Sequence, residues 1–161
     1  MDQLTSVGGL APAFELPNQH GEPVSLESLR GTAAALVFYP FAFSQVCTGE
    51  LDELQAQSEE FRGRNVRLLA ISVDSKYTLR AYAEERGYDF DLLADFWPHG
   101  AVADTYGVLD HTRGYARRAT FFLDPDGVVI ERIDAALGDV RPFDSYLSAL
   151  HSLSTARAVG P

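Results

Sequence analysis

Short apolar runs alternate with amphipathic stretches along most of this chain. Two continuous apolar runs, Ala33–Tyr39 and Val66–Val73, have the pattern of strands that are buried on both faces. Apolar residues recur at helical spacing in three longer stretches, Gly49–Phe61, Tyr77–Arg86 and Phe143–Leu153. Strands that alternate with helices in this way predict an α/β domain.

Shorter segments supply the remaining elements near the N-terminus and in the middle of the chain. Phe14–Leu16 and Val24–Leu26 flank a turn at Gly21, which predicts a small β-hairpin. Asp91–Ala94 is predicted as a short strand, and Val102–Tyr106 as a helical turn.

The beginning of the last quarter of the chain predicts a second hairpin. Thr120–Leu123 and Val128–Ile133 are apolar strands, and residues 124–127 read Asp-Pro-Asp-Gly, a strong turn signal. The two long buried strands are joined through a helix and should be parallel, whereas the hairpin strands must be antiparallel. A mixed central sheet with helices on both faces follows. We expect one domain over residues 1–161, with residues 154–161 as a frayed tail.

Composition and charge narrow the range of functions. The chain has 161 residues, of which 46% are hydrophobic and 22% charged, as in ordinary globular proteins. Its formal net charge is -10, which argues against nucleic acid or an anionic membrane as the main partner. We find no signal-peptide pattern at the N-terminus and no apolar run of membrane-spanning length. With a single cysteine no internal disulfide can form, and a reducing cytoplasmic location is the simplest interpretation.

Cys47 is that single cysteine. It follows a buried strand, Pro40 and a loop, and it precedes an amphipathic stretch, so it should lie near the first turn of a helix. The unpaired N–H groups and the positive dipole end at such a position favour a thiolate over a thiol. The competing interpretation is a small, inert core residue, which a lone cysteine usually is.

Separated segments carry a resemblance to a known family. Pro40–Cys47 (PFAFSQVC) is similar to the Pro-x-x-x-Thr/Ser-x-x-Cys signature of peroxiredoxins, with Ser44 where threonine is commoner. The similarity continues at Glu50 and in further segments. These segments are Val7–Leu16, Asp95–Val102 and Arg118–Phe121. The chain resembles the one-cysteine peroxiredoxins of the alkyl hydroperoxide reductase E type over nearly its whole length.

This resemblance implies a thioredoxin-like fold and a thiol-dependent peroxidase that reduces hydrogen peroxide, organic hydroperoxides and peroxynitrite. Cys47 would attack the peroxide and become a sulfenic acid. Arg118 and the Ser44 hydroxyl would donate hydrogen bonds to the reacting oxygens, and Pro40 would shield the sulfur. Glu50 would support the site by pairing with Arg118, and the alternative for Glu50 is a solvated first-turn glutamate.

Arg117 competes with Arg118, because adjacent strand residues point to opposite faces and only one can reach the sulfur. Physical reasoning from the residues alone leaves both open. The family pattern Arg-x-Thr-Phe selects Arg118 and implies that Arg117 is a surface charge.

The resemblance and the cysteine count together suggest the partners. With no resolving cysteine, reduction must come from an external thiol or redoxin, and the subtype suggests mycothiol with a mycoredoxin-like or thioredoxin-like protein. We expect a homodimer, with Phe41, Phe43 and the Trp97 region as candidate contacts. The chain has no nucleotide-binding fingerprint, and its histidines lack metal-ligand spacing, so we expect neither cofactor nor metal.

Two further functions use the same residues. The protein could be a redox sensor that relays oxidation of Cys47 to a partner. It could also be a thioredoxin-like scaffold in which Cys47 is inert. Catalytic turnover of peroxide separates an enzyme from a sensor, and alkylation of the folded protein separates both from a scaffold.

Overall fold

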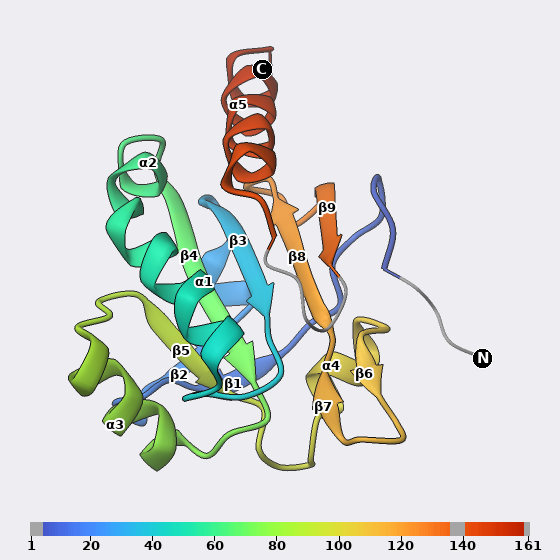
Figure 1. Ribbon diagram of the computed structural model, residues 1–161. Coiled ribbons are helices and arrows are strands. Elements are labelled where there is room, and N and C mark those ends of the chain that lie inside the picture. The colour runs from blue at the N-terminus through green and yellow to red at the C-terminus, as the bar shows by residue number, and fades with distance from the viewer. Residues whose placement is uncertain (1–4, 136–140, 160–161) are drawn as a thin grey trace.

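The computed structural model describes residues 5–135 and 141–159, and its centre is a five-stranded mixed sheet (Figure 1). The strand order is β5-β4-β3-β8-β9. Strand β3 (Ala33–Phe38) lies in the middle with all its residues buried. It pairs in parallel with β4 (Val66–Ser72), which pairs in parallel with β5 (Asp91–Ala94). On its other side lie the antiparallel strands β8 (Arg118–Leu123) and β9 (Val129–Ala135). The predicted mixed sheet is confirmed.

Helices cover both faces of this sheet, as predicted. Helices α1 (Gln45–Ala56), α3 (Lys76–Arg86) and α5 (Phe143–Val159) contribute side chains to the core on one face. The short helix α4 (Ala101–Thr105) and the N-terminal segment contribute to the core on the other. Among the described helices, none has the length and apolar character needed to cross a membrane.

Small hairpins accompany the main sheet. The predicted N-terminal hairpin is present as β1 (Glu15–Pro17) paired antiparallel with β2 (Pro23–Ser25), followed by a 3-10 helix at Glu27–Leu29. A further hairpin, β6 (Leu109–Asp110) with β7 (Tyr115–Ala116), was not predicted. Its strands are too short to show an alternating pattern in the sequence.

The prediction of one helix over Gly49–Phe61 was wrong. The segment contains α1, which begins four residues earlier at Gln45, and a separate helix α2 (Ser58–Arg62). Gln57 separates these two helices, with φ −104° and ψ 17°. The early start was missed because the first turn of α1 contains polar and small residues with no helical apolar period.

The C-terminal helix is also longer than predicted. Helix α5 continues to Val159, past the predicted end at Leu153. Residues 155–158 read Thr-Ala-Arg-Ala, with no helix-breaking residue before Gly160. Residues 160–161 lie outside the described part of the chain.

Candidate active site

Sheet topology brings three segments together at one end of β3. Strand β8 is antiparallel to β3, and Ala119 pairs with Phe38, so β8 begins beside the point where β3 ends. From that point the chain passes through Pro40 and the following loop into α1. Figure 1 shows β3 pointing to the lower end of the sheet, where α1 starts. The first residue of β8, Arg118, is therefore carried to the first turn of α1, which holds Cys47.

The Cys47 sulfur is buried against a cation. Cys47 is 1% exposed, and the Nη2 of Arg118 donates a hydrogen bond to its Sγ at 3.1 Å. An inert core cysteine would be buried too, but among apolar neighbours alone. A guanidinium in contact with the sulfur is instead typical of reactive cysteines.

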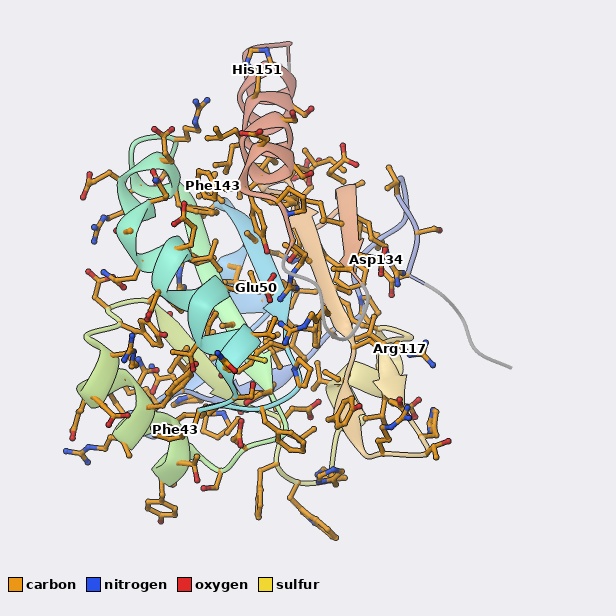
Figure 2. All side chains as sticks on the ribbon, viewed as in Figure 1. Phe43, Glu50, Arg117, Asp134, Phe143 and His151 are labelled. Atoms are coloured by element: carbon orange, nitrogen blue, oxygen red, sulfur yellow. The ribbon has the colours of Figure 1, made fainter. Side chains whose placement is uncertain are left out.

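Glu50 lies one turn further along α1 and is 7% exposed. Nη1 of Arg118 donates to its Oε1, so the predicted pairing is confirmed and the solvated alternative is wrong. Figure 2 shows Glu50 in the middle of the molecule, between α1 and the sheet. One arginine thus contacts both the sulfur and the carboxylate.

Arg141 is the site residue that the sequence analysis missed. It donates three hydrogen bonds to Glu50: its backbone N–H and Nε donate to Oε2 at 2.6 and 2.9 Å, and its Nη2 donates to Oε1 at 2.9 Å. Its Nη1 donates to the Phe38 carbonyl at 2.9 Å and to Thr120 Oγ1 at 3.0 Å. The one available signal was indirect, since a buried carboxylate offers more acceptor positions than one arginine occupies.

Cys47 lies in a cluster of buried charged side chains. Arg118 and Arg141 each carry a permanent positive charge, and Glu50 supplies one negative charge. A buried charge is costly unless it is paired. Arg118 donates to both Glu50 and the Cys47 sulfur, so one cation contacts the carboxylate and the sulfur together. The arrangement therefore places a permanent cation beside the sulfur, in spite of the acidic protein around it.

The same contacts govern the acidity of Glu50. Burial by itself would raise the pKa of this carboxyl, but the hydrogen bonds and charge of Arg141, with the charge of Arg118, bring the pKa below its ordinary value of 4.5. Glu50 thus contributes stability that is complete above the ordinary value and is lost as pH falls through the lower folded-state value.

We predict that the stability of wild type depends on pH in acid more strongly than the stability of Glu50→Gln does. The free energy of unfolding of wild type should exceed that of the variant near neutral pH, and the gap should shrink as pH falls below about 4.5. Urea titrations of both proteins between pH 3 and 7 measure the two free energies of unfolding. A gap that stays constant over this range would contradict the assigned ion pairs.

Ser44 and Pro40 lie in the segment before Cys47. Ser44 is the N-cap residue of α1, and its Oγ donates to the Phe41 carbonyl at 2.8 Å. In this arrangement the hydroxyl oxygen can accept a hydrogen bond from a peroxide, and it can donate one only after the hydroxyl rotates. Pro40 is buried and lies two residues after the end of β3.

Arg117 is separated from this cluster. Its side chain is exposed, and in Figure 2 it extends outward at the side of the molecule away from Glu50. The selection of Arg118 over Arg117 at the sulfur is confirmed by the contact of Arg118 with Sγ.

Comparison with known proteins agrees with this geometry. Residues 7–132 match the model of the AhpC/TSA family, and the chain belongs to this family of peroxiredoxins. It is 40% identical over 152 residues to alkyl hydroperoxide reductase E of Mycobacterium tuberculosis, covering 94% of this chain and 99% of that protein. Alkyl hydroperoxide reductase C of Staphylococcus aureus is 33% identical over 123 residues, covering 74% of this chain and 64% of that protein.

Solved structures show the same fold. The crystal structure of Enterococcus faecalis AhpC has a TM-score of 0.88 at 28% identity, covering 99% of this chain and 98% of that one. The crystal structure of peroxidoxin BcpB from Mycobacterium tuberculosis has a TM-score of 0.81 at 29% identity, covering 99% of this chain and 100% of that one. The protein is a thiol-dependent peroxidase with the thioredoxin-like peroxiredoxin fold, and its single cysteine fits a one-cysteine mechanism.

Proposed function

We propose that the protein reduces hydrogen peroxide and organic hydroperoxides at Cys47. The thiolate attacks the terminal peroxide oxygen, an S–O bond forms, and the O–O bond breaks. The leaving oxygen departs as water or an alcohol after it takes a proton, and Cys47 becomes a sulfenic acid. The observation that carries the proposal is the hydrogen bond from buried Arg118 to the Cys47 sulfur at 3.1 Å. Peroxynitrite is a further substrate, although its anionic form meets a net charge of -10.

Each neighbouring residue has a distinct role in this proposal. Arg118 stabilises the thiolate and the negative charge that develops on the peroxide oxygens. The Ser44 oxygen orients the peroxide, and Pro40 limits access of water to the sulfur. Glu50 orients Arg118 through the ion pair that joins them.

The second half of the cycle uses an external reductant. The sequence has one cysteine, so the sulfenic acid condenses with an external thiol to a mixed disulfide and water, and a second thiol then releases reduced Cys47. Mycothiol with a mycoredoxin-like or thioredoxin-like protein is our proposed reductant. Such a cycle fits a reducing compartment, and we propose the cytoplasm.

The proposal predicts a sulfenic acid at Cys47 after mild oxidation. Wild type treated with about one equivalent of hydrogen peroxide in the presence of dimedone should gain one dimedone adduct, located on Cys47 by peptide mass spectrometry. Dithiothreitol added before dimedone should prevent the adduct, and excess peroxide without reductant should give sulfinic acid. An unmodified Cys47 under these conditions would refute the proposal.

We also propose that the protein is a homodimer. Phe41, Phe43 and Trp97 are 41%, 50% and 80% exposed, and large exposed aromatic side chains are typical of interfaces. Sedimentation velocity at micromolar concentration should give the mass of a dimer, and Trp97→Ala should shift it toward a monomer. A monomeric wild type would contradict this proposal.

A further inference from the structure

The loop between β3 and α1 is held by a hydrogen bond to Asp74, a residue outside the loop and without a role in the proposed function. The loop spans residues 39–44, between the end of the central strand and the helix that carries Cys47. The Ala42 N–H donates a hydrogen bond to Oδ2 of Asp74 at 2.8 Å. Asp74 lies 32 positions further along the chain, just after β4.

Asp74 is itself fixed in place by the sheet. Ser72, the last residue of β4, is fully buried, and its Oγ donates to the same Oδ2 atom at 2.6 Å. Strands β3 and β4 are parallel, with Phe38 paired to Ile71, so the segments that leave them emerge side by side. The carboxylate thus links the rigid end of one strand to the loop that follows its neighbour.

The loop needs such an anchor because its backbone is strained. Phe43 has φ 67°, in the left-handed region that residues other than glycine rarely adopt. Its ring packs on Tyr82 of α3, with ring centroids 4.7 Å apart, and Figure 2 shows Phe43 near this helix. Surrounding contacts must hold a residue in this conformation, and the bond from the preceding Ala42 to Asp74 is one of them.

The loop conformation determines where the reacting groups lie. The Ser44 hydroxyl is bonded within the loop to the Phe41 carbonyl at 2.8 Å, and the Ser44 carbonyl accepts the Thr48 N–H at 2.9 Å in the first turn of α1. A loop that relaxes therefore moves Ser44 and loosens the turn that contains Cys47, whereas Arg118 stays fixed on β8.

We propose that Asp74 is a positioning residue for peroxide reduction. Its carboxylate holds the Ala42 N–H and so keeps Ser44 and the Cys47 turn aligned with Arg118 for attack on the O–O bond. Asp74 touches no reacting atom in this proposal and acts only through the loop. The inference rests on the proposed function of Cys47, Ser44 and Arg118.

The test compares two reactions of Cys47 in several variants. Oxidation by hydrogen peroxide needs the aligned site, whereas alkylation by iodoacetamide needs only an accessible thiolate. In Asp74→Ala, the rate constant for oxidation should fall about tenfold or more, while that for alkylation stays within about threefold of wild type or rises. Asp74→Asn keeps an oxygen that can accept from Ala42 and should oxidise within about threefold of wild type.

Matched controls separate positioning from general loss of structure. Asp124 also accepts backbone N–H groups in a loop, from Asp126 at 2.9 Å and Val128 at 3.0 Å, at the end of β8 opposite to Arg118. Asp124→Ala should leave both rate constants of Cys47 unchanged. If Asp74→Ala fails to fold, Ser72→Ala removes the second hydrogen bond to the carboxylate and should lower oxidation selectively, by a smaller factor.

The outcomes distinguish this inference from the proposed function. A wild type that does not react with peroxide overturns both. A reactive wild type with Asp74→Ala oxidised at the same rate overturns the inference alone. The inference also fails if oxidation and alkylation fall by the same factor, if Asp74→Asn is as slow as Asp74→Ala, or if Ser72→Ala leaves oxidation unchanged where Asp74→Ala does not fold.

Discussion

Replacing Cys47 with serine is expected to abolish peroxide reduction. Nearly every serine hydroxyl is protonated near neutral pH, so serine cannot replace the thiolate as the attacking nucleophile. We expect the rate of reaction with hydrogen peroxide, and with a fatty-acid hydroperoxide, to fall at least about a thousandfold, equivalent to roughly 4 kcal/mol of transition-state stabilisation. Stopped-flow mixing of reduced protein with each peroxide measures both rates.

The fold should survive this substitution, which is nearly isosteric and retains an atom that can accept the Arg118 hydrogen bond. Equal thermal midpoints within a few degrees would show that activity was lost through chemistry alone. Peroxide consumption by Cys47→Ser at the wild-type rate would refute the mechanism. A wild type that consumes one equivalent of peroxide and then stops, with excess thiol present, would favour a redox relay over an enzyme.

Replacing Arg118 with alanine should have the next largest effect. The variant loses the donor to the sulfur and the forked cation that faces the developing negative charge. Removing a comparable oxyanion donor in other enzymes slows catalysis about 100- to 1000-fold, and we expect a loss in that range for oxidation of Cys47. Arg118→Lys keeps the charge but cannot bridge the sulfur and Glu50 as a planar fork does, so we expect an intermediate rate.

Arg117 offers a matched control for this prediction. It is adjacent in sequence, has the same charge and is exposed on the other side of the chain. Arg117→Ala should change the oxidation rate by less than about twofold, because salt screens the charge of an exposed side chain that does not contact the site. Equal effects of the two substitutions would mean that Arg118 acts through net charge and not through its contact with Cys47.

Much of the fold was predictable from local patterns. Buried strands such as Ala33–Phe38 have continuous apolar runs, and the Asp124–Gly127 turn has the residues that its backbone requires. Helix ends were the main errors: α1 begins at Gln45 and α5 ends at Val159. Ends are set by capping and tertiary contacts, which a hydrophobic period does not report.

The residues of the candidate site were likewise only partly predictable from local patterns. Cys47 and Pro40 are separated by a short stretch of chain, so their relation at the start of α1 follows from the order of strand, loop and helix. Arg118 and Glu50 are 68 positions apart, and a family motif, not a physical pattern in the residues, identified the arginine. Arg141 belongs to no such motif, and only the folded chain brings it to Glu50.

The sequence by itself determined that it contains one thiol and that this thiol lies near the start of a helix behind a buried strand, and it led us to predict an external reductant. The tertiary structure decided which cations surround that thiol and how its loop is held. Arg118, Arg141 and Asp74 reach the site from β8, from the segment before α5 and from the end of β4. The physical reason is the distance along the chain between the residues that interact. Local periodicity determines helices and strands, whereas a buried charge cluster depends on strand order and on which strand ends lie side by side.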